Sequence, residues 1–296
     1  MAKGALRGNA LTGILLMIAG VSLIPVSDTV TKYLTATYPV MQVIWMRYAA
    51  QCVIVAILFS LFGRWSLART ARPGLQALRG LFTLVSSIFF VSGLTYLPLV
   101  QAIAITFANP LFVVAFSVPL LGERVGIHRW SAVCIGFAGI LVIMRPNLDT
   151  EWATLLPLGS AVFGSLFQIA TRALAATDHA LTTFLYFNLF GAVALSPILV
   201  SVWIEPSFVD WLWFAAVGLI YGAASYLIIK AFDHADASAL APFFYTQIVS
   251  ATVMGFLVFG DLPDTWTVAG LVIVIGAGLY VVHRERQRRA PRPERA

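Results

Sequence analysis

Long apolar runs dominate the pattern of hydrophobic and polar positions along the 296-residue chain. Each run is about 20 residues long, which is the length that an α-helix needs to cross a bilayer. The runs are continuous and rich in Leu, Val, Ile, Ala, Gly and Phe, whereas membrane β-strands would alternate with a period of two. Ten transmembrane helices are therefore predicted, near residues 10–35, 39–62, 75–97, 99–121, 127–145, 153–175, 180–203, 208–232, 239–260 and 265–283.

Composition supports a membrane location. Hydrophobic residues make up 60% of the chain and charged residues 11%, and the mean hydropathy of +0.89 exceeds what a water-soluble domain can cover with polar surface. The connections are short, and the longest, GRWSLARTARPG at 63–74, leaves no room for a folded domain. The first run is too long for a cleavable signal and is expected to remain as the first helix.

Basic residues are distributed unevenly between the two sides of this arrangement. With the N-terminus inside, sixteen of the nineteen Lys and Arg residues fall inside, Lys32 and Arg145 fall outside, and Arg47 lies within the second helix. Basic residues are retained on the cytoplasmic side, so both termini are expected in the cytoplasm and the multi-pass chain in the bacterial inner membrane. The net charge of +6 reflects this bias, and we expect contact with membrane lipid rather than with nucleic acid.

Residue types that enzymes use are not grouped. The four histidines are far apart and lack metal-ligand spacing, and Cys52 and Cys134 both lie within predicted helices. The sequence has no phosphate-binding G-x-x-x-x-G-K-[ST] loop, which excludes ATP-driven transport by this chain. We therefore expect no enzyme activity, no metal and no cofactor.

A short sequence similarity links the two halves of the chain. Residues 28–34 read DTVTKYL and residues 168–174 read QIATRAL, which aligns Lys32 with Arg172 at an offset of 140 residues (168 minus 28). This offset is about half the chain, so the halves are predicted to be related.

A second short similarity, between LLGERVGIHRW and VFGDLPDTW, aligns Gly122 with Gly260. We predict a five-helix repeat at 1–147, a second five-helix repeat at 148–284, and a basic cytoplasmic tail at 285–296. Because five crossings per repeat is odd, the second repeat must be inverted. The predicted fold class is an all-α integral membrane protein with ten transmembrane helices, arranged as two inverted five-helix repeats around a central cavity.

Inverted repeats are typical of secondary transporters, which expose one central site to each side in turn. A channel filter usually needs rings from several subunits or a re-entrant loop, whereas the repeat gives one chain a two-sided pathway. A functional monomer is therefore expected.

Asp28 and Lys32 interrupt the end of the first apolar run. Asp28 follows about 18 helical residues, or roughly 27 Å, so both charges are predicted near the outer end, and Arg172 near the inner end. We interpret Asp28, Lys32 and Arg172 as gate residues; the alternative is an ordinary i, i+4 ion pair between Asp28 and Lys32. Beside Lys32 and Arg47 the aspartate is expected to stay ionised, which favours downhill or exchange transport without a proton step.

Arg47 lies about two turns inside the second helix, where a lone charge costs at least ~2.5 kcal/mol. It needs a partner, and Asp28 is the economical one, with Lys32 competing. Pro110 and Pro242 are expected to interrupt the fourth and ninth helices. Arg47 and the polar and aromatic residues within the helices are the predicted substrate-binding set: Arg47, Ser86, Phe90, Gln101, Thr106, Asn109, Phe163, Gln168, Tyr221, Tyr226, Tyr245 and Gln247.

The segment LTYLPLVQAIAITFANPLFVVAFSVPLLGERVGIHRWSAVCIGFAGILVIMRP resembles the first repeat of EamA-type carriers of the drug/metabolite transporter superfamily. The resemblance covers all ten helices, and the second repeat departs from it by carrying Gly260 and Asp261 where the first has Gly-Glu-Arg. It implies ten helices in two inverted repeats around a central cavity. Members move amino acids, including the YddG-type aromatic amino-acid exporters, riboflavin, S-adenosylmethionine and drugs.

The sequence thus predicts a secondary transporter of a small metabolite, with aromatic and other neutral amino acids as the first candidates, moved by export or exchange through alternating access. Riboflavin, S-adenosylmethionine and drug-like compounds are the alternative substrates. A channel and a membrane enzyme are the alternative classes.

Overall fold

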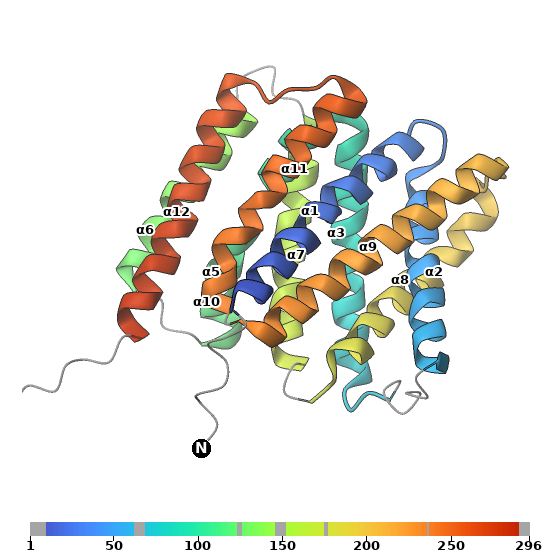
Figure 1. Ribbon diagram of the computed structural model, residues 1–296, viewed down its shortest axis with the longest axis horizontal. Coiled ribbons are helices and arrows are strands. Elements are labelled where there is room, and N and C mark those ends of the chain that lie inside the picture. Colours follow the sequence, from blue (N-terminus) through green and yellow to red (C-terminus); the bar gives the residue numbers. More distant parts are fainter. Residues whose placement is uncertain are drawn as a thin grey trace, which may run out of the picture.

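The computed structural model describes residues 10–61, 69–122, 126–145, 152–174, 177–235 and 237–289. Its described elements are all helical (Figure 1). The bounds are α1 (Ala10–Leu34), α2 (Val40–Leu61), α3 (Pro73–Tyr96), α4 (Leu99–Thr106), α5 (Asn109–Leu121), α6 (Ile127–Met144), η3 (Trp152–Thr154), α7 (Leu155–Leu174), α8 (Ala180–Val202), α9 (Phe208–His234), α10 (Ala237–Leu240), η4 (Ala241–Tyr245), α11 (Thr246–Met254), η5 (Gly255–Phe259) and α12 (Thr265–Arg289).

These helices account for the ten predicted runs. Within the described ranges, eight helical segments are long and apolar enough to cross a membrane, and two shorter apolar helices, Trp130–Met144 and Thr265–Val281, complete the set. The chain is an all-helical integral membrane protein. The last helix continues to Arg289, so the first residues of the segment predicted as a tail are helical.

Two spans are interrupted where proline was expected to interrupt them. Pro110 occupies the first turn of α5, and the turn at Phe107 and Ala108 separates α5 from α4. In the other half, Pro242 lies in the 3₁₀ turn η4 that precedes α11. Proline lacks a backbone N–H and clashes with the preceding turn, which explains why neither span is one regular helix.

The aligned glycines end these interrupted spans in the same way. Gly122 follows α5 with φ +66°, and Gly260 follows the π-helical turn η5 with φ +72°. A Cβ atom disfavours this left-handed conformation, so glycine at both positions lets the chain turn sharply out of the helix.

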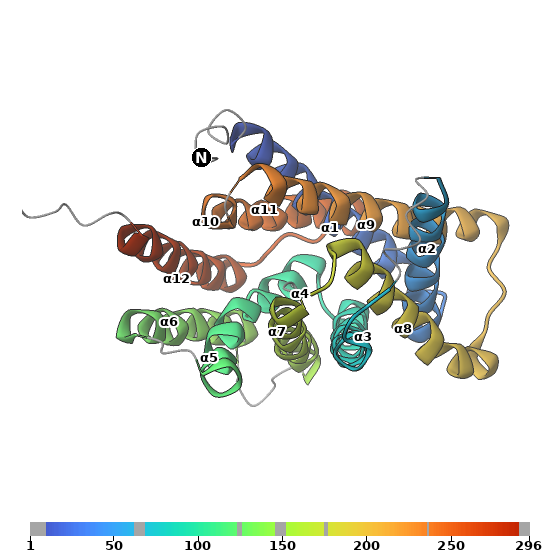
Figure 2. The same cartoon turned by 90° about the horizontal axis from the view of Figure 1, so that it is seen from below.

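The helices form two groups that face each other (Figure 2). The first group contains α1, α2, α9 and α11, because α9 packs on both α1 and α2, and α11 packs on α1. The second contains α3, α4, α5, α7 and α8, because α7 packs on α3, α4 and α5, and α8 packs on α3. We call these the α1 group and the α3 group. The two groups also touch through α2 with α8 and α4 with α11.

Helices α6 and α12 pack side by side at one edge of the molecule (Figure 1). Gly139 and Gly270 lie at their contact, where a Cβ on Gly270 would be 2.6 Å from the Gly139 carbonyl oxygen. Small residues allow such close backbone approach between membrane helices.

Candidate substrate-binding site

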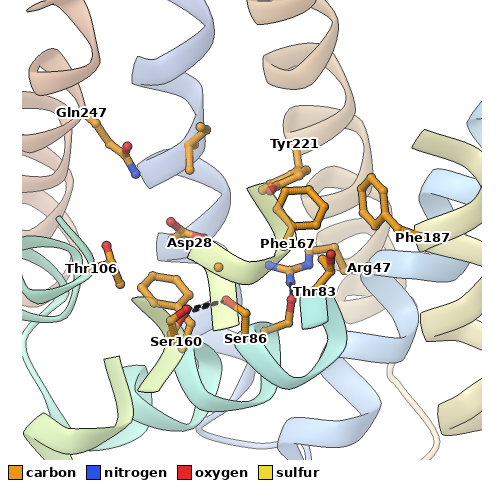
Figure 3. Close-up of a pocket in the computed structure, with 14 residues that line it drawn as sticks. Asp28, Arg47, Thr83, Ser86, Thr106, Ser160, Phe167, Phe187, Tyr221 and Gln247 are labelled. Carbon is orange, nitrogen blue, oxygen red and sulfur yellow. Dashed lines mark hydrogen bonds between the residues drawn. The ribbon is translucent and has the colours of Figure 1, made fainter. Parts of the chain in front are cut away.

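A pocket of about 230 Å³ lies between the α1 group and the α3 group (Figure 3). The two walls differ in chemistry. The charged groups and the Tyr221 phenol come from the α1 group, and the Ser and Thr hydroxyls and the phenyl rings come from the α3 group. The α1 group contributes Ile24, Asp28, Arg47, Tyr221 and Gln247; the α3 group contributes Thr83, Ser86, Ser87, Phe90, Thr106, Ser160, Gly164, Phe167 and Phe187.

Arg47 is held in place from both sides of the pocket. Its side chain is 7% exposed, and its Nη2 donates a hydrogen bond of 3.0 Å to Ser87 Oγ in the facing wall. The guanidinium also lies 5.3 Å from the centre of the Tyr221 ring and 5.6 Å from that of Tyr48. Since these contacts are a hydroxyl and two aromatic faces, the positive charge of Arg47 is oriented but not neutralised by them.

Asp28 shares this wall and is 3% exposed. Its charge interacts electrostatically with Arg47, but within the described residues no ion pair or hydrogen bond to its side chain forms. The expected direct contact with Arg47 is therefore absent. The pocket thus holds one carboxylate and one guanidinium that leave each other free to bind a third group.

Lys32, one turn beyond Asp28, points away from the pocket. Its Nζ donates a hydrogen bond of 2.7 Å to the Leu97 carbonyl oxygen, lies 3.8 Å from Asp261 Oδ2, and lies 4.8 Å from the centre of the Phe259 ring. The i, i+4 pair with Asp28 is not formed. Instead, Lys32 joins the end of α1 to the turns after α3 and η5, at what we call the Lys32 end of the bundle.

Hydroxyl groups and small residues shape the facing wall. Ser86 Oγ donates to the Ser160 carbonyl oxygen at 2.9 Å and lies 3.0 Å from Ser160 Oγ, which ties α3 to α7. At Gly164 a Cβ would come within 2.5 Å of Asn109 Nδ2. Glycine here lets the Asn109 amide approach α7, where its Oδ1 accepts a 2.8 Å hydrogen bond from Gln168.

Arg79 lies beneath the aromatic part of the pocket. It is 5% exposed, its Nε donates to Thr171 Oγ1 at 2.6 Å, and its Nη1 donates to the Thr183 carbonyl oxygen at 2.9 Å. The guanidinium stacks 4.3 Å from the centre of Phe167 and 5.2 Å from that of Phe187. Both rings line the pocket, so Arg79 fixes their positions.

Asp178 closes a polar cluster beyond Arg79, outside the spans, at what we call the Asp178 end. Its carboxylate accepts hydrogen bonds from Gln76 Nε2 at 2.7 Å, from the Ala71 backbone N–H at 3.2 Å, and from the Thr70 hydroxyl. Partial burial opposes ionisation, but the donated hydrogen bonds outweigh it and lower the pKa of Asp178 below its ordinary value. The ionised carboxylate ties the start of α3 to the start of α8.

A comparable cluster lies at the Lys32 end. Tyr38 donates to Asp210 Oδ2 at 2.7 Å, and Gln42 exchanges two hydrogen bonds with the backbone of Ile204, at 2.6 Å and 3.0 Å. It ties the start of α2 to the start of α9, as the Asp178 cluster ties α8 to α3.

The residues predicted from sequence are partly gathered here. Those that line the pocket are Asp28, Arg47, Ser86, Phe90, Thr106, Tyr221 and Gln247. The others lie elsewhere. Asn109 and Gln168 hydrogen-bond to each other, Phe163 stacks on Phe89 with ring centres 5.8 Å apart, and Tyr245 stacks on Phe107 with ring centres 5.4 Å apart. Tyr226 is 54% exposed, Gln101 is half-buried in α4, Lys32 points to Asp261, and Arg172 is exposed in the last turn of α7.

Several lining residues were not predicted, namely Ile24, Thr83, Ser87, Ser160, Gly164, Phe167 and Phe187. A signal for two of them was present in the sequence. Positions 83, 86, 87 and 90 follow the i, i+3, i+4, i+7 spacing of one helix face. A continuous face of hydroxyls ending in Phe90 indicates that α3 turns this face to a polar cavity.

Comparisons with known proteins agree with this architecture. Among curated relatives, an S-adenosylmethionine uptake transporter of Rickettsia prowazekii is 27% identical over 263 residues, covering 88% of this chain and 89% of the relative. A riboflavin transporter of Rhizobium johnstonii is 29% identical over 292 residues, covering 95% and 94%. A pseudopaline exporter of Pseudomonas aeruginosa is 26% identical over 269 residues, covering 90% and 94%.

A solved crystal structure has the same fold, with a TM-score of 0.65 at 19% identity over 95% of this chain and 99% of the other. The model of the EamA-like transporter family matches twice, at residues 11–145 and 151–283. The chain therefore belongs to the EamA-like transporter family, and its relatives are small-molecule transporters of bacterial membranes.

Proposed function

We propose that the chain is a secondary transporter that moves a small metabolite with an α-amino-acid group and an aromatic or apolar part across the inner membrane. The observation that carries this proposal is the pocket wall on which Asp28 and Arg47 stand together without forming an ion pair. A zwitterion presents the complementary pair of charges.

Aromatic and other neutral amino acids are the first candidates. The α-carboxylate would bind the Arg47 guanidinium, because two parallel N–H donors match a carboxylate, and the α-ammonium would face Asp28. The apolar part would lie against Phe90, Phe167 and Phe187 in the facing wall. Aromatic walls with a few polar groups are typical of small-molecule sites.

S-adenosylmethionine is the second candidate. Relatives that cover most of this chain are S-adenosylmethionine uptake transporters. This compound carries the same α-amino-acid group together with a purine ring and a sulfonium cation. Riboflavin, the substrate named for another relative, has the aromatic part but no ammonium, so the charged wall favours it less.

The helix pairings support two inverted repeats, at 1–147 and 148–284, and transport by alternating access. If each span is exchanged with the one five spans later, the pair of α1 with α9 becomes the pair of α7 with α3, and α1 with α11 becomes α7 with α5. The pairs of α2 with α8 and α6 with α12 map onto themselves. The α1 group and the α3 group are thus counterparts, and rocking one against the other would open the pocket to one side and then the other.

The contacts of Lys32 support its proposed role as a gate. With both termini in the cytoplasm, the Lys32 end faces outward, and Lys32 holds α1 against the turns at Leu97 and Asp261. Arg172, its counterpart in the repeat, would serve the inward side. The repeats lie within one chain, so a monomer is the proposed functional unit.

Counterflow into liposomes that hold the purified protein tests the function. The liposomes are preloaded with tryptophan, S-adenosylmethionine or riboflavin, and uptake of the same labelled compound is measured. Saturable exchange of tryptophan or S-adenosylmethionine that Arg47→Ala abolishes and Lys230→Ala preserves is the expected result, since Lys230 is a half-exposed cation on α9 outside the pocket. Exchange of riboflavin alone would keep the transporter but reject the amino-acid class, and linear, non-saturating flux would favour a channel.

A further inference from the structure

We propose that Asp28 couples transport to protons, because it binds in turn a proton and the cationic group of the substrate and so exchanges one for the other. This inference deepens the proposed function and rests on it for the use of the pocket by substrate. It departs from the sequence-based expectation, which left out a proton step on the ground that Asp28 stays ionised beside Lys32 and Arg47.

The first support is the isolation of the Asp28 carboxylate. Asp28 is 3% exposed, lines the pocket, and has no ion pair or hydrogen bond to its side chain within the described residues. Lys32, one turn away on the same helix, is bound to Leu97 and Asp261 instead. Of the two basic side chains expected beside Asp28, Lys32 is therefore bound elsewhere, and Arg47 acts on it without direct contact.

The second support is the set of groups that face Asp28 from the neighbouring helices. From α2, Arg47 interacts with it through space but donates its hydrogen bond to Ser87. From α9, the Tyr221 hydroxyl interacts electrostatically with Asp28. From α11 and α4 come the uncharged side chains of Gln247 and Thr106 (Figure 3). The α3, α7 and α8 residues in the wall add hydroxyls, glycine and phenyl rings. Asp28 is the single carboxylate among the described residues that line the pocket.

Burial in the pocket makes the charge of Asp28 costly. A buried carboxylate that forms no direct ion pair or hydrogen bond is costly to desolvate, and the Arg47 charge acts on Asp28 only through space. Two species can remove that cost here, namely a proton, which gives the neutral carboxylic acid, and an ammonium, which gives an ion pair. Both need the same oxygen atoms, so they exclude each other.

Exchange follows from this exclusion. On one side the substrate ammonium meets the protonated Asp28, the O–H proton leaves to water on that side, and the ion pair replaces the O–H bond. On the other side a proton adds to the carboxylate as the substrate leaves. If the unneutralised carboxylate disfavours closure, the carrier changes sides only when loaded with one of the two, and one proton moves against each substrate molecule.

Chemical labelling tests proton binding directly. Dicyclohexylcarbodiimide adds to protonated carboxyl groups in apolar surroundings, and mass spectrometry locates the adduct in the purified, reconstituted chain. Labelling of Asp28 should fall as buffer pH rises from about 5 to about 9, and tryptophan or S-adenosylmethionine should block it, whereas riboflavin should not. The control Asp210→Asn, at the Lys32 end and outside the pocket, should leave the labelling unchanged.

A flux measurement tests coupling. With the membrane potential held at zero by valinomycin and equal potassium, liposomes one pH unit more acidic inside should accumulate the transported probe about tenfold in wild type, because one proton per molecule sets that limit. Asp28→Asn should lose the accumulation, and Asp28→Glu should restore part of it. Normal counterflow with no accumulation and no effect of pH on labelling would overturn the coupling and leave the proposed function standing. Labelling that neither tryptophan nor S-adenosylmethionine blocks would also overturn the exchange.

Discussion

Lys32 Nζ donates to the Leu97 carbonyl oxygen at 2.7 Å and lies 3.8 Å from Asp261 Oδ2, so one side chain joins α1 to the turns that end α3 and η5. Lys32 is only partly exposed, whereas Asp261 is more than one-third exposed. Exposed ion pairs contribute little, so the hydrogen bond to the buried turn is the stronger part of this contact. In the proposed alternating-access cycle, this contact would hold the Lys32 end closed.

Lys32→Gln should shift the carrier toward the state that is open at the Lys32 end, because the charged donor to Leu97 is lost. A hydrogen bond from a charged group is worth about 1.5–3 kcal/mol, enough to change the ratio of the two states about tenfold or more. Accessibility of a single cysteine introduced at the Ser87 position to a membrane-impermeant maleimide added from each side measures this ratio.

Arg172→Gln should shift the carrier in the opposite direction, since the proposed repeat would put Arg172 at the other mouth. The same cysteine reporter measures it. A shift in the same direction for both substitutions would contradict the symmetric gates. Lys230→Gln, which removes a half-exposed cation from α9, serves as the control with no expected shift.

Arg47→Lys should impair transport nearly as strongly as Arg47→Ala. Lysine keeps the charge but loses the planar fork that can bind a carboxylate and Ser87 at once. We expect at least about a tenfold loss of apparent affinity in counterflow, from one charged hydrogen bond. Full affinity in Arg47→Lys would mean that Arg47 only joins α2 to α3 through Ser87.

The sequence predicted the helices because continuous apolar runs of membrane length satisfy their backbone groups within one helix. It predicted both interruptions because proline lacks a backbone N–H and clashes with the preceding turn, although Pro25, Pro119 and Pro197 lie inside α1, α5 and α8. It also predicted that Asp28 and Arg47 lie near each other. It could not predict where Lys32 points, since a long, flexible side chain reaches either its i−4 neighbour or a turn far away in the chain. The Leu97 carbonyl that captures Lys32 is 65 residues away.

The sequence also could not show which of two neighbouring faces of α7 lines the pocket. Phe163 and Gln168 were predicted for the site, but Gly164 and Phe167 line it. On a helix that packs on several neighbours, a shift of one residue turns the side chain by about 100°. The surrounding helices, and not the local sequence, decide which of these residues faces the pocket.

Asp178→Asn should lower the stability of the folded protein at neutral pH, and it should reduce the loss of stability as the pH falls. The pKa of Asp178 is lowered from 3.8 on folding, so its stabilisation is fully present above the unfolded value and is lost as pH falls through the folded one. We expect a cost of about 1 kcal/mol at neutral pH for the hydrogen bonds weakened. Thermal unfolding in detergent from neutral to about pH 3 measures both, and an unchanged acid dependence in the variant would show that other carboxylates cause it.

Gln51→Met should stabilise the protein. Gln51 is 1% exposed in α2, and both its amide nitrogen and its amide oxygen have no hydrogen-bond partner among the described residues. An unsatisfied buried polar group costs about 1–3 kcal/mol, and an apolar side chain of similar shape removes that cost. We therefore expect the midpoint of thermal unfolding in detergent to rise.

Gln42 provides the matched control, since it lies on the same helix, is 0% exposed, and exchanges two hydrogen bonds with Ile204. Gln42→Met leaves that backbone N–H and carbonyl without partners, so it should destabilise the protein by about 1–3 kcal/mol. The two substitutions should change stability in opposite directions only because Gln42 is hydrogen-bonded and Gln51 is not, since burial and residue type are the same. If Gln51→Met destabilised the protein as much as Gln42→Met, the Gln51 amide would have to be hydrogen-bonded in the membrane, and a bound water molecule would be the first partner to look for.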